Sequence, residues 1–84
     1  MKADFKAIAL MLATQAGIHL GTIPDPIHQT RNLNLDKAGL FLTLLEVLEE
    51  KTRGNLSEEE HTFLAGLLEN LGEVMRLRQG GEKT

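Results

Sequence analysis

The sequence contains no cysteine, tryptophan or tyrosine. Without cysteine the chain has no disulfide bond, no thiolate ligand for zinc and no thiol nucleophile. Three phenylalanines are the only aromatic side chains, so stacking platforms for bases or sugar rings are not expected. A chain of 84 residues buries a smaller share of its surface than a larger domain does. Its stability must come from the packing of aliphatic side chains or from assembly with a partner subunit.

Excess positive charge and long apolar runs are also missing. The formal net charge is −3, so the chain has no general attraction to phosphate backbones. No apolar run approaches the roughly 18 residues that cross a bilayer, and the acid Asp4 follows closely on Lys2 near the start, unlike the start of a signal peptide. We therefore expect a cytoplasmic protein that binds neither nucleic acid nor membranes.

A first helix is predicted at about residues 3–20, because apolar residues recur there at three- and four-residue steps. The main row is Phe5, Ile8, Leu12, Ala16 and Leu20, and Ala7, Met11 and Ile18 widen it. Gly21 is expected to end the helix in the left-handed conformation. The connection at 21–35 then has no helical or alternating pattern, and Pro24 and Pro26 flank Asp25 within it. We interpret it as a connector, with a binding loop as the alternative.

A second helix is predicted at about residues 36–52, with Asn34 or Asp36 as its cap. Its apolar residues form two rows. The first row is Ala38, Phe41, Leu45 and Leu48, and the second is Leu40, Leu44 and Val47. A surface helix needs only one apolar stripe, so we expect the second row to face a neighbouring subunit.

The stretch from Lys51 to Glu60 is predicted to form a tight corner. Gly54 suits the positive φ angle that ends a helix. Ser57 and Glu60 have the Ser-x-x-Glu spacing of a capping box, in which each side chain accepts a hydrogen bond from the other residue's backbone. A third helix is therefore predicted to begin at residue 58.

This third helix is expected to cover residues 58–79, to end at Gly80-Gly81 and to leave a frayed tail at 80–84. It is longer than the other two, so its last turns overhang unless a second subunit covers them. Gly66 and Gly72 are poor helix formers, and a close approach of another helix would explain them.

The sequence therefore predicts one all-α domain over residues 1–84. We expect a three-helix, hairpin-like bundle that a second copy completes into a larger helical bundle, as a homodimer. The interface candidates are Leu40, Leu44, Val47, Gly66, Met75 and Leu77.

Two motifs carry a resemblance to a known family. The first is the run Lys-Thr-Arg-Gly-Asn-Leu-Ser-Glu-Glu-Glu at 51–60, preceded by Ala38 and by Leu45-x-x-Leu48, and the second is Leu20-Gly21-x-x-Pro24-Asp25-Pro26. From about Phe5 to Leu71 the chain resembles the bacterial domain of unknown function 1844 family. It departs from the family's pattern at Thr43 and Gly72. The resemblance implies a small, cytoplasmic, uncharacterised helical protein with no assigned activity, and it supplies no catalytic residue.

The residues themselves offer little chemistry. Three histidines, His19, His28 and His61, lie in different segments without the spacing of a metal motif. Asp25, His28 and His19 are the only candidates for a metal or acid–base site, and we assign no catalytic residue, metal or cofactor. The favoured function is a structural or protein-interaction module that acts as a homo-oligomer, with an unidentified protein partner. The alternative is a small metal- or ligand-binding protein, or an enzyme, that uses those three residues.

Overall fold

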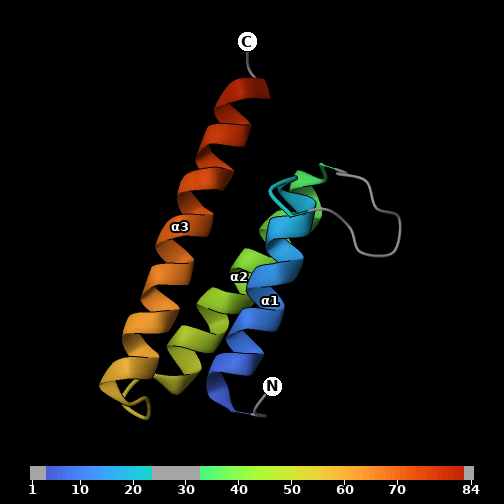
Figure 1. The fold of residues 1–84 in the computed structure, drawn as a ribbon. Helices are drawn as coiled ribbons and strands as arrows, with labels where there is room; N and C mark the ends of the chain where they lie inside the picture. Colours follow the sequence, from blue (N-terminus) through green and yellow to red (C-terminus); the bar gives the residue numbers. More distant parts are fainter. Residues whose placement is uncertain (1–3, 24–32, 83–84) are drawn as a thin grey trace.

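Three α-helices run up, down and up again in the computed structural model, which describes residues 4–23 and 33–82 (Figure 1). They are α1 (Phe5–His19), α2 (Leu35–Thr52) and α3 (Glu58–Glu82). The described residues contain no strand, and the predicted all-α, three-helix fold is confirmed. The Cα trace measures 41 × 28 × 16 Å, about two packed helix layers in its thinnest direction. In so thin a bundle, each helix keeps an outward side.

Each helix begins at a side chain that accepts a hydrogen bond from the first turn. Asp4 Oδ1 accepts from the Ala7 amide at 3.0 Å, and Asn34 Oδ1 accepts from the Lys37 amide at 3.1 Å. The capping box of α3 is present as predicted. Ser57 Oγ accepts from the Glu60 amide at 3.1 Å, and Glu60 Oε1 accepts from the Ser57 amide at 2.9 Å. Of the two predicted caps for α2, Asn34 is the one used.

Glycine ends two of the helices in the left-handed conformation. Gly21 has φ of 80° and Gly54 has φ of 87°, which confirms both predicted stops. The predicted stop at Gly80-Gly81 is wrong, because α3 continues to Glu82. Glycine tolerates a left-handed angle but does not impose one, and these two residues keep the helical conformation.

The core lies where the three helices meet. Its buried centre consists of Ala9, Ala13, Leu45 and Leu64. Partly buried side chains surround it, namely Phe5, Leu12, Leu48, Leu56, Phe63, Leu67, Leu68 and Leu71. α1 contributes two alanines, Ala9 and Ala13, to this buried centre. Their small side chains let the neighbouring helix backbones come close.

The inward side of α1 differs from the prediction. Ile8 and Met11 belong to the apolar side predicted for the first helix, but they are 52% and 67% exposed, whereas Ala9 and Ala13 are buried. Because α1 is apolar around most of its girth, its periodicity does not distinguish the two sides. Packing buries the side with small residues and leaves large apolar side chains outside.

The C-terminal end of α1 is folded tightly. A Cβ atom at Gly17 would lie 2.6 Å from Ile23 Cδ1, so the chain after α1 packs back onto this glycine. The turn is held by the Thr22 and Ile23 amides, which both donate to the Gly17 carbonyl oxygen. A larger residue at position 17 would require the Ile23 side chain to shift.

Candidate interaction surfaces

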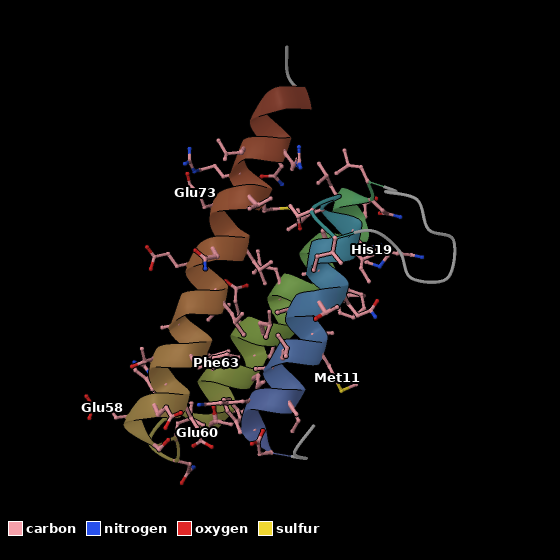
Figure 2. All side chains as sticks on the ribbon, in the orientation of Figure 1. Met11, His19, Glu58, Glu60, Phe63 and Glu73 are labelled. Atoms are coloured by element: carbon pink, nitrogen blue, oxygen red, sulfur yellow. The ribbon has the colours of Figure 1, made fainter. Side chains whose placement is uncertain are left out.

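The largest exposed apolar residues of α1 and α2 form the main candidate site. We call the set Ile8, Met11, Leu40, Leu44 and Val47 the outer face; all five are exposed. Met11 points away from α3 (Figure 2). Because α1 and α2 are antiparallel (Figure 1), Ile8 lies at the level of the C-terminal half of α2, where Leu44 and Val47 are found.

A groove of about 340 Å³ lies next to these residues. It is lined by Leu10, Met11, Leu12, Thr14 and Gln15 of α1 and by Phe41 of α2. No residue of α1 between Lys6 and His19 carries an ionisable side chain. The groove is therefore uncharged and suits apolar side chains.

His19 forms one end of this region. Its ring stacks on Phe41 with centroids 5.7 Å apart and planes 10° apart, and its carbonyl oxygen accepts a hydrogen bond from the Asn34 amide at 2.8 Å. His19 thus joins the end of α1 to the beginning of α2, which is a structural role.

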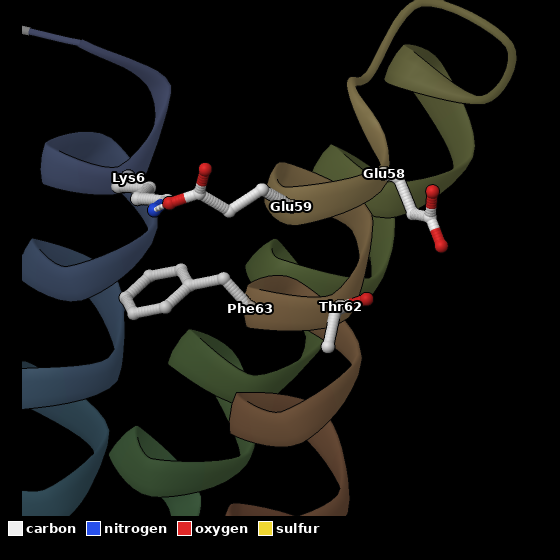
Figure 3. A pocket seen from close by; sticks show the side chains of 5 residues that line it. All are labelled: Lys6, Glu58, Glu59, Thr62 and Phe63. Atoms are coloured by element: carbon white, nitrogen blue, oxygen red, sulfur yellow. Dashed lines mark hydrogen bonds and ion pairs between the residues drawn. The ribbon is translucent and has the colours of Figure 1, made fainter.

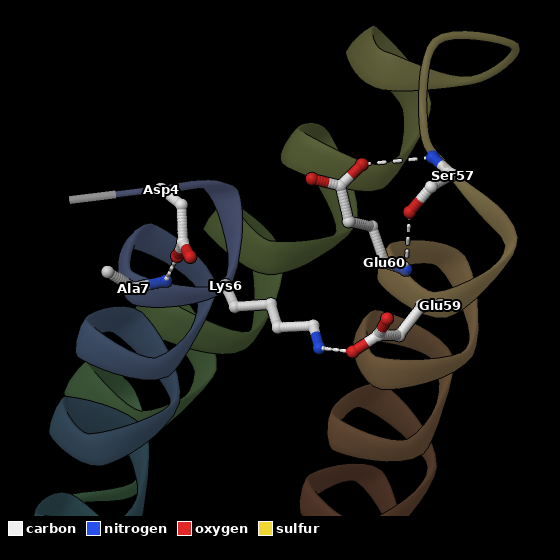
Figure 4. Close-up of polar contacts among 6 residues, drawn as sticks. All are labelled: Asp4, Lys6, Ala7, Ser57, Glu59 and Glu60. Carbon is white, nitrogen blue, oxygen red and sulfur yellow. Dashed lines mark hydrogen bonds and ion pairs between the residues drawn. The ribbon is translucent and has the colours of Figure 1, made fainter. Parts of the chain in front are cut away.

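A second, open groove lies at the other end of the bundle, between the first turns of α1 and α3 (Figure 3). Lys6, Glu58, Glu59, Thr62 and Phe63 line it. Lys6 forms an ion pair with Glu59 beside the capping box (Figure 4), and its Nζ lies 5.7 Å from the centre of the Phe63 ring. The charges of this groove therefore join α1 to α3.

Arg78 makes the corresponding contact at the far end of α3. Its Nε donates a hydrogen bond to the Leu20 carbonyl oxygen at 3.0 Å. Leu20 is the C-cap of α1, where unpaired carbonyls and the helix dipole favour a positive charge. Arg78 thus fastens the overhanging turns of α3 to the end of α1.

Two further ion pairs lie on exposed helix surfaces. The Arg53 guanidinium donates to both carboxylate oxygens of Glu49, at 2.8 and 3.3 Å, and this hydrogen bonding lowers the pKa of Glu49. Arg76 likewise lowers the pKa of Glu73 by a hydrogen bond within α3. Each pair stays within one helix or its cap, so we assign it a local structural role.

Four of the predicted interface residues are exposed, whereas a fifth, Met75, packs against another helix of the same chain. Leu40, Leu44 and Val47 are exposed together on α2, and Leu77 is 60% exposed on α3. Met75 contacts α2 within the chain, since its Cε lies 3.5 Å from where a Cβ of Gly39 would stand.

The two mid-helix glycines of α3 remain unexplained by the fold. Apart from the chain neighbours and the nearby backbone of α3 itself, no atom of the described residues lies within 4 Å of a Cβ placed on Gly66 or Gly72. The predicted close approach of another helix to these glycines is therefore not found within the described chain.

The predicted metal candidates are not brought together by the described residues. Asp25 and His28 lie outside the described ranges, and His19 is stacked on Phe41. Within residues 4–23 and 33–82, no group of three or more His, Asp or Glu side chains is placed to hold a metal ion.

Sequence reasoning missed the contributions of Ile8, Met11, Lys6 and Arg78. Ile8 and Met11 were recognised as apolar, but nothing in a helix that is apolar around most of its girth marks them as exposed. The roles of Lys6 and Arg78 left no local signal either, because their partners are more than fifty positions away.

None of the helices in the described ranges is both long enough and apolar enough to cross a membrane. No curated protein and no solved structure matches the chain significantly. One family model does match, that of Domain of unknown function (DUF1844), over residues 2–77. This match spans all but the last turns of α3, so the chain belongs to the DUF1844 family.

Proposed function

We propose that the protein is a homo-oligomeric protein-interaction module. The observation that supports this function is the number of large apolar side chains exposed to solvent. They are Ile8, Leu10, Met11, Ile23, Leu33, Leu40, Leu44, Val47 and Leu77. Single exposed apolar residues are common on soluble proteins, but contiguous groups of them mark interaction sites. The outer face is such a group.

The contacts of two basic side chains also favour a structural role over chemistry. Lys6 is paired with Glu59 in the open groove, and Arg78 caps the Leu20 carbonyl. Both basic groups hold helices together. The alternative site at Asp25 and His28 has no supporting observation among the described residues, and His19 already has a structural partner.

The oligomeric state tests the proposal directly. Sedimentation velocity of the wild-type chain across the micromolar range should give a mass above the 9.3 kDa of one chain, rising with concentration. A single species of one chain at every concentration would contradict the proposal.

The proposal includes a cytoplasmic location in a bacterium and an additional protein partner. The support is the family resemblance, and fractionation of cells that produce a tagged chain tests the location. Affinity capture of the same chain should recover one protein reproducibly at a fixed ratio to the bait. Recovery of the tagged chain alone would limit the module to self-association.

A further inference from the structure

We infer that the outer face binds a second copy of this chain, with the ridge formed by Leu40, Leu44 and Val47 of each copy lying in the groove between α1 and α2 of the other. This inference rests on the proposed self-association and specifies its surface. The position of the ridge beside the groove is the first observation in its favour. Phe41 lines the groove, and Leu44 stands three positions further along α2, which makes the two residues neighbours on the helix surface.

A ridge beside a groove can meet the requirement of a two-fold contact between identical chains. In such a contact the same patch is used on both subunits, so it must complement itself. A rotation that puts the Leu44 ridge of one copy into the groove of its partner puts the partner's ridge into the first groove. A different protein would need only one of the two features.

The exposed surface of the chain leaves area for such a contact. The whole chain, including the residues outside the described ranges, exposes 5886 Å², whereas a folded chain of 9.3 kDa is expected to expose roughly 5,000 Å². A standard interface buries about 800 Å² on each partner, and the outer face, whose side chains are between 39% and 67% exposed, is the surface that a second copy would cover.

The distribution of charge fits a contact with an apolar centre and a polar rim. Lys37 and Lys51 stand seven positions before and after Leu44, so they lie near the two ends of the ridge on the same side of α2. The groove that receives the ridge has no ionisable side chain on α1 between Lys6 and His19. Both lysines therefore remain at the rim, where stable interfaces place their charges.

The arrangement leaves α3 on the outside of the dimer. α3 packs on α1 and α2 through Leu64 and its neighbours, and its solvent side carries charged residues such as Glu69 and Glu73. The dimer then has α3 as its outermost layer on both sides and the four helices α1 and α2 of the two copies between them.

Substitution of Leu44 by Glu tests the surface, with Leu77→Glu as the matched control. Both leucines are exposed, and Leu77 lies on α3 outside the outer face. Leu44→Glu should raise the dimer dissociation constant at least about 30-fold, as expected for the loss of a central contact. Leu77→Glu should leave it unchanged. Circular dichroism should show wild-type helicity for both chains, since neither side chain is buried.

The outcomes separate this inference from the proposed function. A wild-type monomer would overturn both. A wild-type dimer that survives Leu44→Glu, or that dissociates with Leu77→Glu, would overturn the outer-face contact and leave self-association intact.

A cross-linking experiment provides an independent readout, because the chain has no cysteine of its own. Leu44→Cys chains mixed with Gln15→Cys chains should oxidise to the mixed covalent dimer, since Leu44 lies on the ridge and Gln15 in the groove. Ala65→Cys chains, with the thiol on the exposed side of α3, should not form a mixed dimer with Gln15→Cys chains. Equal yields from the two mixtures would contradict the proposed contact.

Discussion

Gly54 shows how the backbone conformation of one residue determines which side chain is tolerated there. Its φ of 87° is left-handed, and apart from its two chain neighbours no described residue lies within 4 Å of a Cβ built on it. Space is therefore available for a side chain, and only the backbone angle demands glycine.

Substitution of Gly54 by Ala is expected to lower the free energy of unfolding by about 1 kcal/mol, because alanine is strained at this angle. Gly66→Ala is the matched control. Gly66 lies inside α3 with open space around it among the described residues, and alanine should stabilise the helix there by up to about 1 kcal/mol. Urea unfolding of the two variants measures both changes, and a loss of stability in Gly66→Ala would show that an atom outside the described contacts approaches that glycine.

The ion pair between Glu49 and Arg53 leads to a prediction of how the stability of the fold depends on pH. The hydrogen bond from Arg53 lowers the pKa of Glu49 in the folded chain. A carboxyl with a lowered pKa contributes stability above its unfolded pKa, and the contribution disappears as the pH falls through the folded pKa. The window therefore lies below about pH 4. The Glu49 carboxyl resonance should titrate at higher pH in Arg53→Gln than in the wild type, and an unchanged midpoint would contradict the assigned cause.

At the scale of the element, the capping box stabilises the first turn of α3. Ser57→Ala removes the acceptor of the Glu60 amide and should lower the free energy of unfolding by about 1 kcal/mol. Thr62→Ala, at an exposed position one turn later, should change it by less than about 0.5 kcal/mol. Hydrogen exchange should locate the effect of Ser57→Ala in the first turn of α3. Equal effects of the two variants would argue against the cap.

Features of an element that depend on neighbouring residues could be predicted from the sequence. The glycine stops at Gly21 and Gly54 and the Ser57–Glu60 box each involve residues a few positions apart, and their chemistry is visible in a short window. The inward side of α1 could not be predicted, because Ile8 and Ala9 both belong to apolar rows. Only packing against α2 and α3 decides between them.

At the scale of the candidate site, the sequence indicated the exposed row on α2 but not the exposed residues of α1 beside it. The row Leu40, Leu44 and Val47 could be recognised as surplus, since α2 already had a complete apolar stripe without it. Its counterpart on α1, including Met11, required the structure. The hydrogen bond from Arg78 to Leu20 could not be predicted from the sequence either, because no local pattern links residues 58 positions apart.

At the scale of the whole molecule, two adjacent leucines are expected to separate folding from the proposed association. Leu45 is fully buried, whereas Leu44 is 39% exposed. Leu45→Ala should lower the free energy of unfolding by about 2–5 kcal/mol at every protein concentration. Leu44→Ala should mainly weaken the rise of the thermal midpoint with concentration that the proposed dimer would produce. Calorimetry over a range of concentrations distinguishes the two. An unaltered concentration dependence in Leu44→Ala would count against the outer-face dimer.

The ion pair and the hydrogen bond that join α1 to α3 also affect the order in which the chain folds. Lys6–Glu59 and Arg78–Leu20 join residues 53 and 58 positions apart, whereas α1–α2 and α2–α3 are hairpins of consecutive helices. Closing the longer loop costs more chain entropy, so we expect the Arg78 contact to form after the folding transition state. Stopped-flow measurements on Arg78→Gln should then show faster unfolding and a nearly unchanged folding rate. Arg78 would set how long the folded chain lasts, and the hairpins how quickly it forms.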